Sequence, residues 1–312
     1  MSDIFDTIII GAGPAGLSAG IYAARAEMNF MIIERSSAVG GQVLSTYEVE
    51  NYPGIPGKSG SELSDCFREH CEKLGCSFVT GEVVDIQHVN GLLPGQGSFF
   101  EVSLIDGRSF TSRAVIAATG ASHKTLGVKG EEEFAGMGVS YCATCDGAFF
   151  KNKAVTIIGG GNVAVEDAIY LSRMCSKVYL VHRRNEFRAD KALVTEASNQ
   201  ANIEFVLNST PEEITGTDLV EKVIVRNKET DALRELPCNG VFIAVGIKPA
   251  TELFTDLCET DEAGFIKADE TGVTSCPGLF AAGDIRTKQL RQIITAASDG
   301  ANCIASVGKF NG

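Results

Sequence analysis

Two cysteines three positions apart are the residues of this sequence best suited to redox chemistry. Cys142 and Cys145 enclose only Ala143 and Thr144, a spacing that allows the two thiols to close into a disulfide and open again. Cys-x-x-Cys motifs commonly lower the pKa of one thiol, and the thiolate is the form that attacks a partner's disulfide. The spacing therefore predicts thiol–disulfide exchange.

Asp146 directly follows this pair. A carboxyl at that place is suited to carry a proton to the leaving thiolate. Alternatively, Asp146 is a turn residue before Gly147 or a helix cap, because Asp is common at both. The sequence leaves both interpretations open.

The other cysteines have no redox or metal spacing. A zinc site needs a second close pair or a His-x3–5-His segment, and the four histidines are scattered, so we expect no metal. Free cysteine is among the most buried residue types, so we expect small core or surface thiols. These residues are Cys66, Cys71, Cys76, Cys175, Cys238, Cys258, Cys276 and Cys303.

Length and charge narrow the function classes. The 312 residues are enough for about two domains. A net charge of -13 disfavours a nucleic-acid partner, which needs clustered Lys and Arg. The chain opens without a basic signal-peptide region, and no apolar run reaches the length of a membrane helix. We therefore expect a cytoplasmic protein that does not bind membranes.

One strand–glycine–helix–strand unit occurs twice. The first has a strand at residues 7–10, the turn Gly11-Ala12-Gly13-Pro14-Ala15-Gly16, a helix to about Ala26 and a strand at 30–33. The second has a strand at 154–158, the turn Gly159-Gly160-Gly161-Asn162-Val163-Ala164, a helix at 165–174 and a strand at 178–181. Such glycines permit a tight turn, close approach of a pyrophosphate and close helix–strand packing. The repeat predicts two dinucleotide-binding folds.

Further patterns indicate how the two folds are joined. An amphipathic helix is predicted at 59–74, a loop at 91–98, and strands at 114–118, 240–245 and 278–282. Because strand patterns return after the second unit, we expect an α/β protein of two Rossmann-like, three-layer domains, the second inserted in the first. The expected boundaries are 1–118 with 246–312 for the first domain and 119–245 for the second.

The residue that ends the second strand of each unit indicates the nucleotide. Counting 23 residues from Gly11 reaches Glu34, whose carboxylate suits an unphosphorylated ribose. The same count from Gly159 reaches His182, followed by Arg183, Arg184 and Arg188, which suit a 2′-phosphate. The second unit is therefore predicted to bind NADPH; the alternative is a solvated basic helix start. Two nicotinamide sites would be redundant, so the first unit is expected to bind a flavin that accepts the hydride.

The chain resembles the low-molecular-weight bacterial thioredoxin reductases over essentially its whole length. The resemblance is carried by the two glycine turns, Cys142-Ala143-Thr144-Cys145-Asp146-Gly147 and six further stretches. These are Gly40-Gly41-Gln42, Glu50-Asn51-Tyr52-Pro53-Gly54, Ala118-Thr119-Gly120, His182-Arg183-Arg184-Asn185-Glu186-Phe187-Arg188-Ala189, Gly278-Leu279-Phe280-Ala281-Ala282-Gly283-Asp284 and Arg291-Gln292-Ile293.

This resemblance implies a reaction and the residues that perform it. Electrons would pass from NADPH through FAD to the Cys142–Cys145 disulfide and then to thioredoxin or a thioredoxin-like protein. Cys145 would face the flavin, Cys142 would attack thioredoxin and Asp146 would be the acid. A homodimer is implied, as is rotation of the inserted domain about linkers near residues 119–122 and 245–248, which contain glycine.

Motifs and resemblance together assign the cofactor sites. The FAD site is expected to comprise Gly11, Gly13, Pro14, Ala15, Gly16, Glu34, Gly40, Gly41, Gln42, Asn51, Thr119, Gly120, Gly283, Asp284, Arg291, Gln292 and Ile293. The NADPH site is expected to comprise Gly159, Gly161, Asn162, Val163, Ala164, His182, Arg183, Arg184 and Arg188. Val163 departs from the family, which usually has Ser or Thr there, and this puts one pyrophosphate contact in doubt.

Three other functions fit parts of the pattern. The same scaffold supports a related thiol–disulfide oxidoreductase or a thiol oxidase with a different acceptor. A flavin reductase without a dithiol step is disfavoured by the cysteine pair, and a non-enzymatic nucleotide sensor would need a broken site. The distinguishing measurement between the first of these and a thioredoxin reductase is hydrogen peroxide production against thioredoxin turnover.

Overall fold

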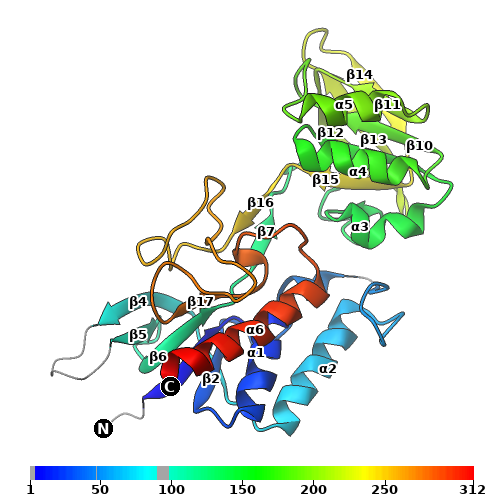
Figure 1. Cartoon of the computed structure of the whole chain (residues 1–312). Helices are drawn as coiled ribbons and strands as arrows, with labels where there is room; N and C mark the ends of the chain where they lie inside the picture. The colour runs from blue at the N-terminus through cyan, green and yellow to red at the C-terminus, as the bar shows by residue number, and fades with distance from the viewer. Residues whose placement is uncertain (1–3, 47, 90–97) are drawn as a thin grey trace. The chain divides into compact units, whose positions relative to one another are not determined.

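A computed structural model describes residues 4–46, 48–89 and 98–312 of the chain (Figure 1). It divides into two compact units, Met1–Ser122 with Lys248–Gly312, and His123–Ile247. The loop predicted at 91–98 lies, apart from Ser98, outside the described residues. Each unit has its own parallel sheet, so the predicted α/β class with two dinucleotide-binding folds is confirmed.

The first unit is built on a seven-stranded sheet with the order β3-β2-β1-β6-β5-β4, in which β17 also pairs with β6. Strands β1, β2, β3, β6 and β17 are parallel, and β4 and β5 are antiparallel additions. The strands are β1 (Phe5–Ile10), β2 (Phe30–Glu34), β3 (Phe78–Thr80), β4 (Val83–Val89), β5 (Phe99–Leu104), β6 (Ser109–Ala117) and β17 (Leu279–Ala281). The helical elements are α1 (Pro14–Arg25), η1 (Gly41–Ser45), α2 (Gly60–Lys73), η3 (Gly283–Ile285) and α6 (Ile293–Asn311).

The central strands of this sheet are buried on both faces. Ile9 and Ile32 point into a core with α1 and α6, which lie side by side in Figure 1, while Ile8 and Ile33 point into a second core on the other face. A strand buried on both faces reads as a continuous apolar run. This burial is why residues 7–10 are recognisable as a strand without polar alternation.

Local capping explains where the helices of this unit begin. Pro14 stands in the first turn of α1, where its missing N–H costs no hydrogen bond. The predicted helix at 59–74 is confirmed as α2, with Ser59 as N-cap in a capping box with Glu62.

The second unit has a five-stranded parallel sheet with the order β11-β10-β9-β15-β8 and a three-stranded antiparallel sheet with the order β12-β13-β14. The parallel strands are β8 (Val139–Ser140), β9 (Ala154–Gly159), β10 (Lys177–Val181), β11 (Ile203–Val206) and β15 (Gly240–Ala244). The antiparallel strands are β12 (Ser209–Gly216), β13 (Val220–Asn227) and β14 (Leu233–Pro237). The helical elements are α3 (Ala143–Asp146), η2 (Gly147–Phe150), α4 (Asn162–Ser172) and α5 (Lys191–Ser198).

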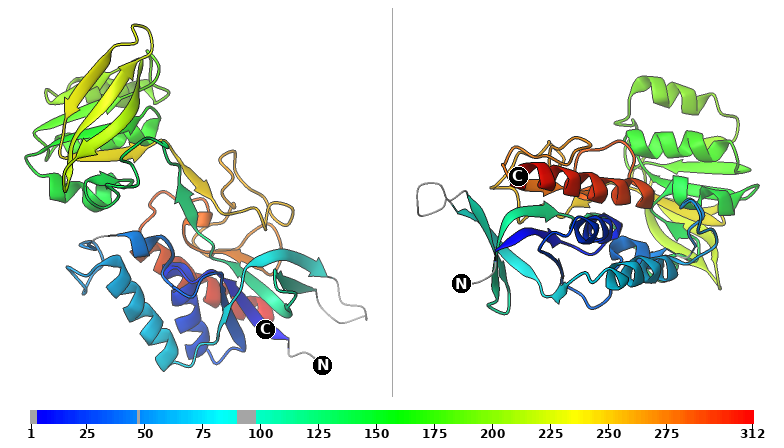
Figure 2. Two further views of the ribbon diagram at one scale, coloured as in Figure 1. Left: turned by 180° about the vertical axis from the view of Figure 1, so that it is seen from behind. Right: turned by 60° about the horizontal axis from the view of Figure 1, so that its bottom comes forward.

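These elements form three layers. One core lies between the helices and the parallel sheet, and the other lies between that sheet and β12–β14 (Figure 2). The helix predicted at 165–174 instead spans α4, Asn162–Ser172. It begins earlier because Gly161 is the extended N-cap and helical geometry starts directly after it.

Two short strands connect the units. β7 (Ala121–His123) and β16 (Ile247–Pro249) pair with each other, so both crossings of the chain run through one two-stranded ribbon. Gly120 and Gly246 stand beside them with φ of 72° and 120°, a backbone region that favours glycine. Within the described residues, every helix is too short or too polar to span a membrane.

Candidate active site

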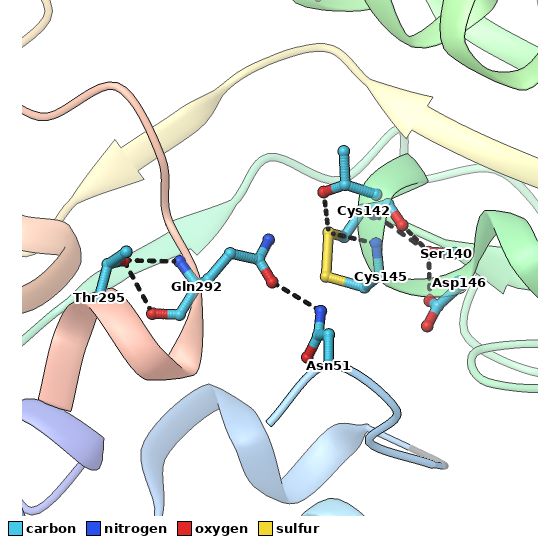
Figure 3. The surroundings of a disulfide bond; sticks show 8 residues. Asn51, Ser140, Cys142, Cys145, Asp146, Gln292 and Thr295 are labelled. Atoms are coloured by element: carbon cyan, nitrogen blue, oxygen red, sulfur yellow. Dashed lines mark hydrogen bonds between the residues drawn. A yellow bond between two sulfur atoms is a disulfide. The ribbon is translucent and has the colours of Figure 1, made fainter. Parts of the chain in front are cut away.

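Cys142 and Cys145 form a disulfide at the start of α3, as predicted (Figure 3). Their Cα atoms are 5.3 Å apart. The Cys142 sulfur accepts the N–H of Cys145 at 3.2 Å and lies 3.4 Å from the Thr144 hydroxyl oxygen. Hydrogen-bond donors directed at a sulfur favour its thiolate form, so the same two groups stand ready to stabilise a thiolate on Cys142 after reduction.

Ser140 links Asp146 to the cysteine pair (Figure 3). The Ser140 hydroxyl donates to Asp146 Oδ2 at 2.5 Å and accepts the N–H of Cys142 at 3.0 Å. Burial raises the pKa of Asp146, and the hydrogen bond from Ser140 offsets part of that rise. Asp146 stands at the N-cap position of η2, but within the described residues its side chain makes no capping hydrogen bond there. A carboxyl whose pKa is raised, beside a disulfide, is suited to supply a proton.

The other cysteines are structural, as expected. None of the eight is in a disulfide; Cys66 is partly exposed and the remaining seven are buried. Burial raises the pKa of Cys258 to about 11 and that of Cys303 to about 12, which keeps these thiols protonated and unreactive. Among the described residues there is no group of three His, Cys, Asp or Glu side chains arranged to bind a metal.

The first glycine turn has no room for a side chain at two of its glycines. Gly11 has φ of 106°, and a Cβ there would lie 2.4 Å from the Ala118 carbonyl oxygen. A Cβ at Gly16 would lie 1.8 Å from the Gly11 carbonyl oxygen. A Cβ at Gly13, by contrast, would meet only the Gly40 carbonyl oxygen, at 3.9 Å. The turn therefore leaves room for a ligand at the second glycine and at the start of α1, where Pro14 and Ala15 stand.

Glu34 lies at this turn, as its position at the end of β2 predicts. Its Oε2 accepts the N–H of Ala12 at 2.7 Å, and its Oε1 accepts the N–H of Ser36 at 3.2 Å. The Gly40 N–H donates to the Ala12 carbonyl at 2.8 Å, which brings Gly40 and Gly41 against the turn. Three segments distant in sequence thus meet at one end of the sheet.

Gln42, Thr119 and Gly120 bind the segments that lead to the ribbon. The Gln42 amide donates to the Ala121 carbonyl, and the Thr119 hydroxyl donates to the Ala250 carbonyl at 2.7 Å. The Ala250 N–H donates to the Gly120 carbonyl at 3.0 Å. These residues are therefore anchors of the connecting strands within the first unit.

Asn51 and Gln292 contact each other, although 241 positions separate them. Asn51 Nδ2 donates to Gln292 Oε1 at 2.8 Å (Figure 3). Gln292 is the N-cap of α6, whose first residue is Ile293, and its backbone N–H donates to the Thr295 hydroxyl at 3.1 Å. The Asn51 segment is thereby tied to the start of α6.

Asp284 and Arg291 each leave a buried polar atom without a partner. Asp284 Oδ1 and Arg291 Nε make no hydrogen bond in the part of the chain that the structure describes. Burial raises the pKa of Asp284 and lowers that of Arg291. The Arg291 guanidinium lies 4.1 Å above the centre of the Phe265 ring. Buried polar atoms normally have partners, so both residues are suited to contact a polar ligand.

A buried ionic cluster supports these two residues. Asp299 accepts from Arg286 at 2.6 Å and from Lys288 at 2.8 Å, and all three side chains are at most 7% exposed. Asp299 also accepts the N–H of Gly283 at 2.9 Å, so α6 holds the segment that carries Asp284. This cluster was not predicted; its only sequence signal is a lone acid among apolar residues of the last helix.

The second glycine turn repeats the packing of the first. A Cβ at Gly159 would lie 2.5 Å from the Ala244 carbonyl oxygen and 2.7 Å from the Ala164 Cβ. Gly161 has nothing within 4 Å of a Cβ position, so it is the open glycine of this turn. His182 is buried against the turn and stacks on Phe187 with ring centres 5.3 Å apart. Burial lowers the pKa of His182, which keeps its ring neutral.

The three predicted phosphate-binding arginines lie beside this turn. The Arg188 N–H donates to the Gly160 carbonyl at 2.8 Å, which folds the arginine segment back onto the glycines. Arg183, Arg184 and Arg188 are exposed, and within the described residues none of them forms an ion pair. Three uncompensated guanidinium groups at one turn are suited to a dianion.

Two further residues of the predicted NADPH site, Asn162 and Val163, differ in their surroundings. Asn162 exchanges two hydrogen bonds of 2.9 Å with Asp190, so its side chain fastens the arginine segment to α4. Val163 is 62% exposed and presents an apolar side chain in the first turn of α4. The sequence analysis did not identify Ser140 as a functional residue of this unit. Its one sequence signal is a hydroxyl two residues before Cys142.

Comparisons with known proteins agree with this geometry. Residues 5–300 match the family model described as pyridine nucleotide-disulphide oxidoreductase. A thioredoxin reductase from Listeria innocua is 43% identical over 298 residues, 95% of this chain and 91% of the relative. A thioredoxin reductase from Bacillus subtilis is 42% identical over 308 residues, 98% of this chain and 95% of the relative. The crystal structure of a thioredoxin reductase from Streptococcus pyogenes is 42% identical, covers 99% of each chain and has a TM-score of 0.92.

Proposed function

This chain belongs to the pyridine nucleotide-disulphide oxidoreductase family, and on that premise we propose that it is an NADPH-dependent, FAD-containing thioredoxin reductase. The observation that carries the proposal is the Cys142–Cys145 disulfide, held beside Asp146 in a unit that also contains a glycine turn with three exposed arginines. The substrate class is the disulfide of a thioredoxin-like protein. The resemblance also supports a homodimer, which light scattering of the purified protein tests.

The residues of the first unit fit FAD. Gly13 leaves open space at the start of α1, and Glu34 lies where a ribose would be bound. Asp284 Oδ1 and Arg291 Nε, without partners among the described residues, supply a buried acceptor and a buried donor for polar groups of the cofactor. When bound, FAD takes up hydride from NADPH and gives two electrons to a disulfide. Gln42, Asn51, Thr119, Gly120, Gln292 and Ile293 would shape the rest of this site.

The residues of the second unit fit NADPH. The open face of Gly161 and the start of α4 would receive the pyrophosphate, and Arg183, Arg184 and Arg188 would bind the 2′-phosphate. His182 would support the arginine segment by packing against Phe187 and the glycine turn. Asn162, which hydrogen-bonds to Asp190, would hold the arginine segment beside the start of α4, and Val163 offers no hydroxyl.

The cysteine pair then performs the exchange. The Cys142 thiolate attacks one sulfur of the partner's disulfide, which forms a mixed disulfide and expels the partner's other sulfur as a thiolate. Asp146 supplies the proton for that thiolate. The Cys145 thiolate attacks the Cys142 sulfur, re-forms the intramolecular disulfide and expels the partner's remaining sulfur as a thiolate. A proton from solvent then leaves the partner as a dithiol. Two electrons leave this chain in each cycle.

Steady-state NADPH oxidation with a purified thioredoxin tests the proposal. The wild type should turn over, while Cys142→Ser and Cys145→Ser should lose thioredoxin reduction but keep a flavin that NADPH bleaches. Cys66→Ser is the matched control, because Cys66 is a partly exposed thiol outside any disulfide. Full thioredoxin turnover by Cys142→Ser, or hydrogen peroxide as the main product of the wild type, would contradict the proposal.

A further inference from the structure

The hydroxyl of Ser140 occupies a fixed position between two groups of the redox site. Ser140 is 7% exposed and ends β8, where it pairs with Phe242 of β15. Its oxygen accepts the Cys142 N–H at 3.0 Å, lies 2.5 Å from Asp146 Oδ2 and lies 3.4 Å from the Cys142 carbonyl oxygen. A side chain on a paired strand is a rigid support for a site on a short helix.

A serine hydroxyl has one proton to donate and two lone pairs to accept with. While Asp146 is ionised, the proton points to its carboxylate across the 2.5 Å contact. Once Asp146 is protonated, its own O–H can donate to the Ser140 oxygen, and the Ser140 proton can turn to the Cys142 carbonyl at 3.4 Å. Both protonation states are therefore satisfied without movement of the heavy atoms.

We propose that Ser140 is a positioning residue for Asp146, which keeps the carboxyl beside the Cys142–Cys145 pair both before and after it gives up its proton. This inference rests on the proposed function, because an acid that serves repeated disulfide exchange must pass through both states. The hydrogen bond from Ser140 is the one side-chain hydrogen bond that Asp146 makes among the described residues. Without it, the ionised carboxylate keeps no hydrogen-bond donor from the part of the chain that the structure describes.

Ser140 is the main polar group that acts on the pKa of Asp146. α3 packs against η2 and α4. η2 carries no ionisable side chain, and the ionisable side chains of α4 are Glu166, Asp167 and Tyr170. The pKa of Asp146 responds to burial, which raises it, and to the Ser140 hydrogen bond, which lowers it. Loss of the hydroxyl should therefore move the titration of Asp146 to higher pH.

A direct test follows the Asp146 carboxyl by ¹³C NMR in the oxidised holoprotein, with the signal assigned by its loss in Asp146→Asn. The titration midpoint should move to higher pH in Ser140→Ala and return toward the wild-type value in Ser140→Thr, which keeps a hydroxyl. Bleaching of the flavin by NADPH in each variant verifies that it is folded. An unchanged midpoint in folded Ser140→Ala would overturn the proposal.

A kinetic test uses protein reduced by NADPH and the small alkyl disulfide bis(2-hydroxyethyl) disulfide, whose leaving thiolate is basic enough to need a proton. Ser140→Ala should slow the exchange by about tenfold, because a mispositioned acid loses part of its contribution. Ser140→Ala combined with Asp146→Asn should be no slower than Asp146→Asn alone; losses that multiply would show that Ser140 acts independently. The NMR readout needs neither NADPH nor thioredoxin, so a shifted midpoint in a protein that reduces no thioredoxin would reject the proposed function and leave the role of Ser140 standing.

Discussion

Gly160 and the ring of His182 are in such close contact that a Cβ at position 160 would lie 2.1 Å from His182 Nδ1. The ring in turn stacks on Phe187, and the Arg188 N–H bonds to the Gly160 carbonyl. The glycine turn and the arginine segment are therefore one packed structure. A change at the turn should be transmitted to the arginines.

Gly160→Ala should displace His182 and with it the arginine segment. We expect the KM for NADPH to rise at least about tenfold and the melting temperature to fall, because overpacking costs about 1–3 kcal/mol. Gly161→Ala is the matched control, since its Cβ would meet nothing within 4 Å. That variant should weaken NADPH binding while keeping the melting temperature. Equal melting temperatures of the two variants would contradict the packing argument.

The arginines should determine the choice between NADPH and NADH. Arg183→Ala combined with Arg184→Ala removes two exposed guanidinium groups that lack ion pairs among the described residues, so the loss should fall on the 2′-phosphate rather than on the fold. Since a hydrogen bond to a charged group contributes about 1.5–3 kcal/mol, the KM for NADPH should rise by about 100-fold with little change for NADH. Arg173→Ala, an exposed arginine at the other end of α4, should leave both constants unchanged. An equal rise in the KM for NADH and the KM for NADPH would show that these arginines do not recognise the 2′-phosphate.

The Asp299 cluster should be required for a stable first unit. Asp299→Ala leaves Arg286 and Lys288 buried without their counter-charge, and breaking a buried pair costs about 3–5 kcal/mol. The urea midpoint should fall, and FAD should dissociate at lower urea concentration because Gly283 loses its anchor next to Asp284. Asp65→Asn, an exposed acid on α2, serves as the control. If Asp299→Ala kept FAD up to the same urea concentration as the wild type, the cluster would not support the cofactor site.

The sequence predicts the parts of this protein whose geometry is local. Gly11 and Gly159 mark turns because close contact with Ala118 and Ala244 leaves no room for a side chain, and Glu34 lies at its turn because the strand length fixes it there. Ser140 and the Asp299 cluster were missed, since each depends on a hydrogen bond between separate elements. The β12–β14 layer was also missed, because antiparallel pairing at the back of a parallel sheet has no fixed motif.

Asp167 should make the stability of the second unit depend on pH. Burial raises the pKa of this carboxyl on α4 to about 7, with a further contribution from Glu166. Well below pH 4 the folded and unfolded states both hold the proton. Between about pH 4 and pH 7 the unfolded state loses it first, so the free energy of unfolding falls as pH rises, by up to about 4 kcal/mol for a shift of roughly three units.

Asp167→Asn removes this titration. The variant should therefore be more stable than the wild type at pH 8 and differ little from it at pH 4, as measured by urea unfolding at both values. Glu196→Gln, an exposed acid on α5, is the control and should show no such pH-dependent difference. If Asp167→Asn were equally stabilising or destabilising at both pH values, the carboxyl would not be held protonated by burial, and the change would reflect packing of the amide instead.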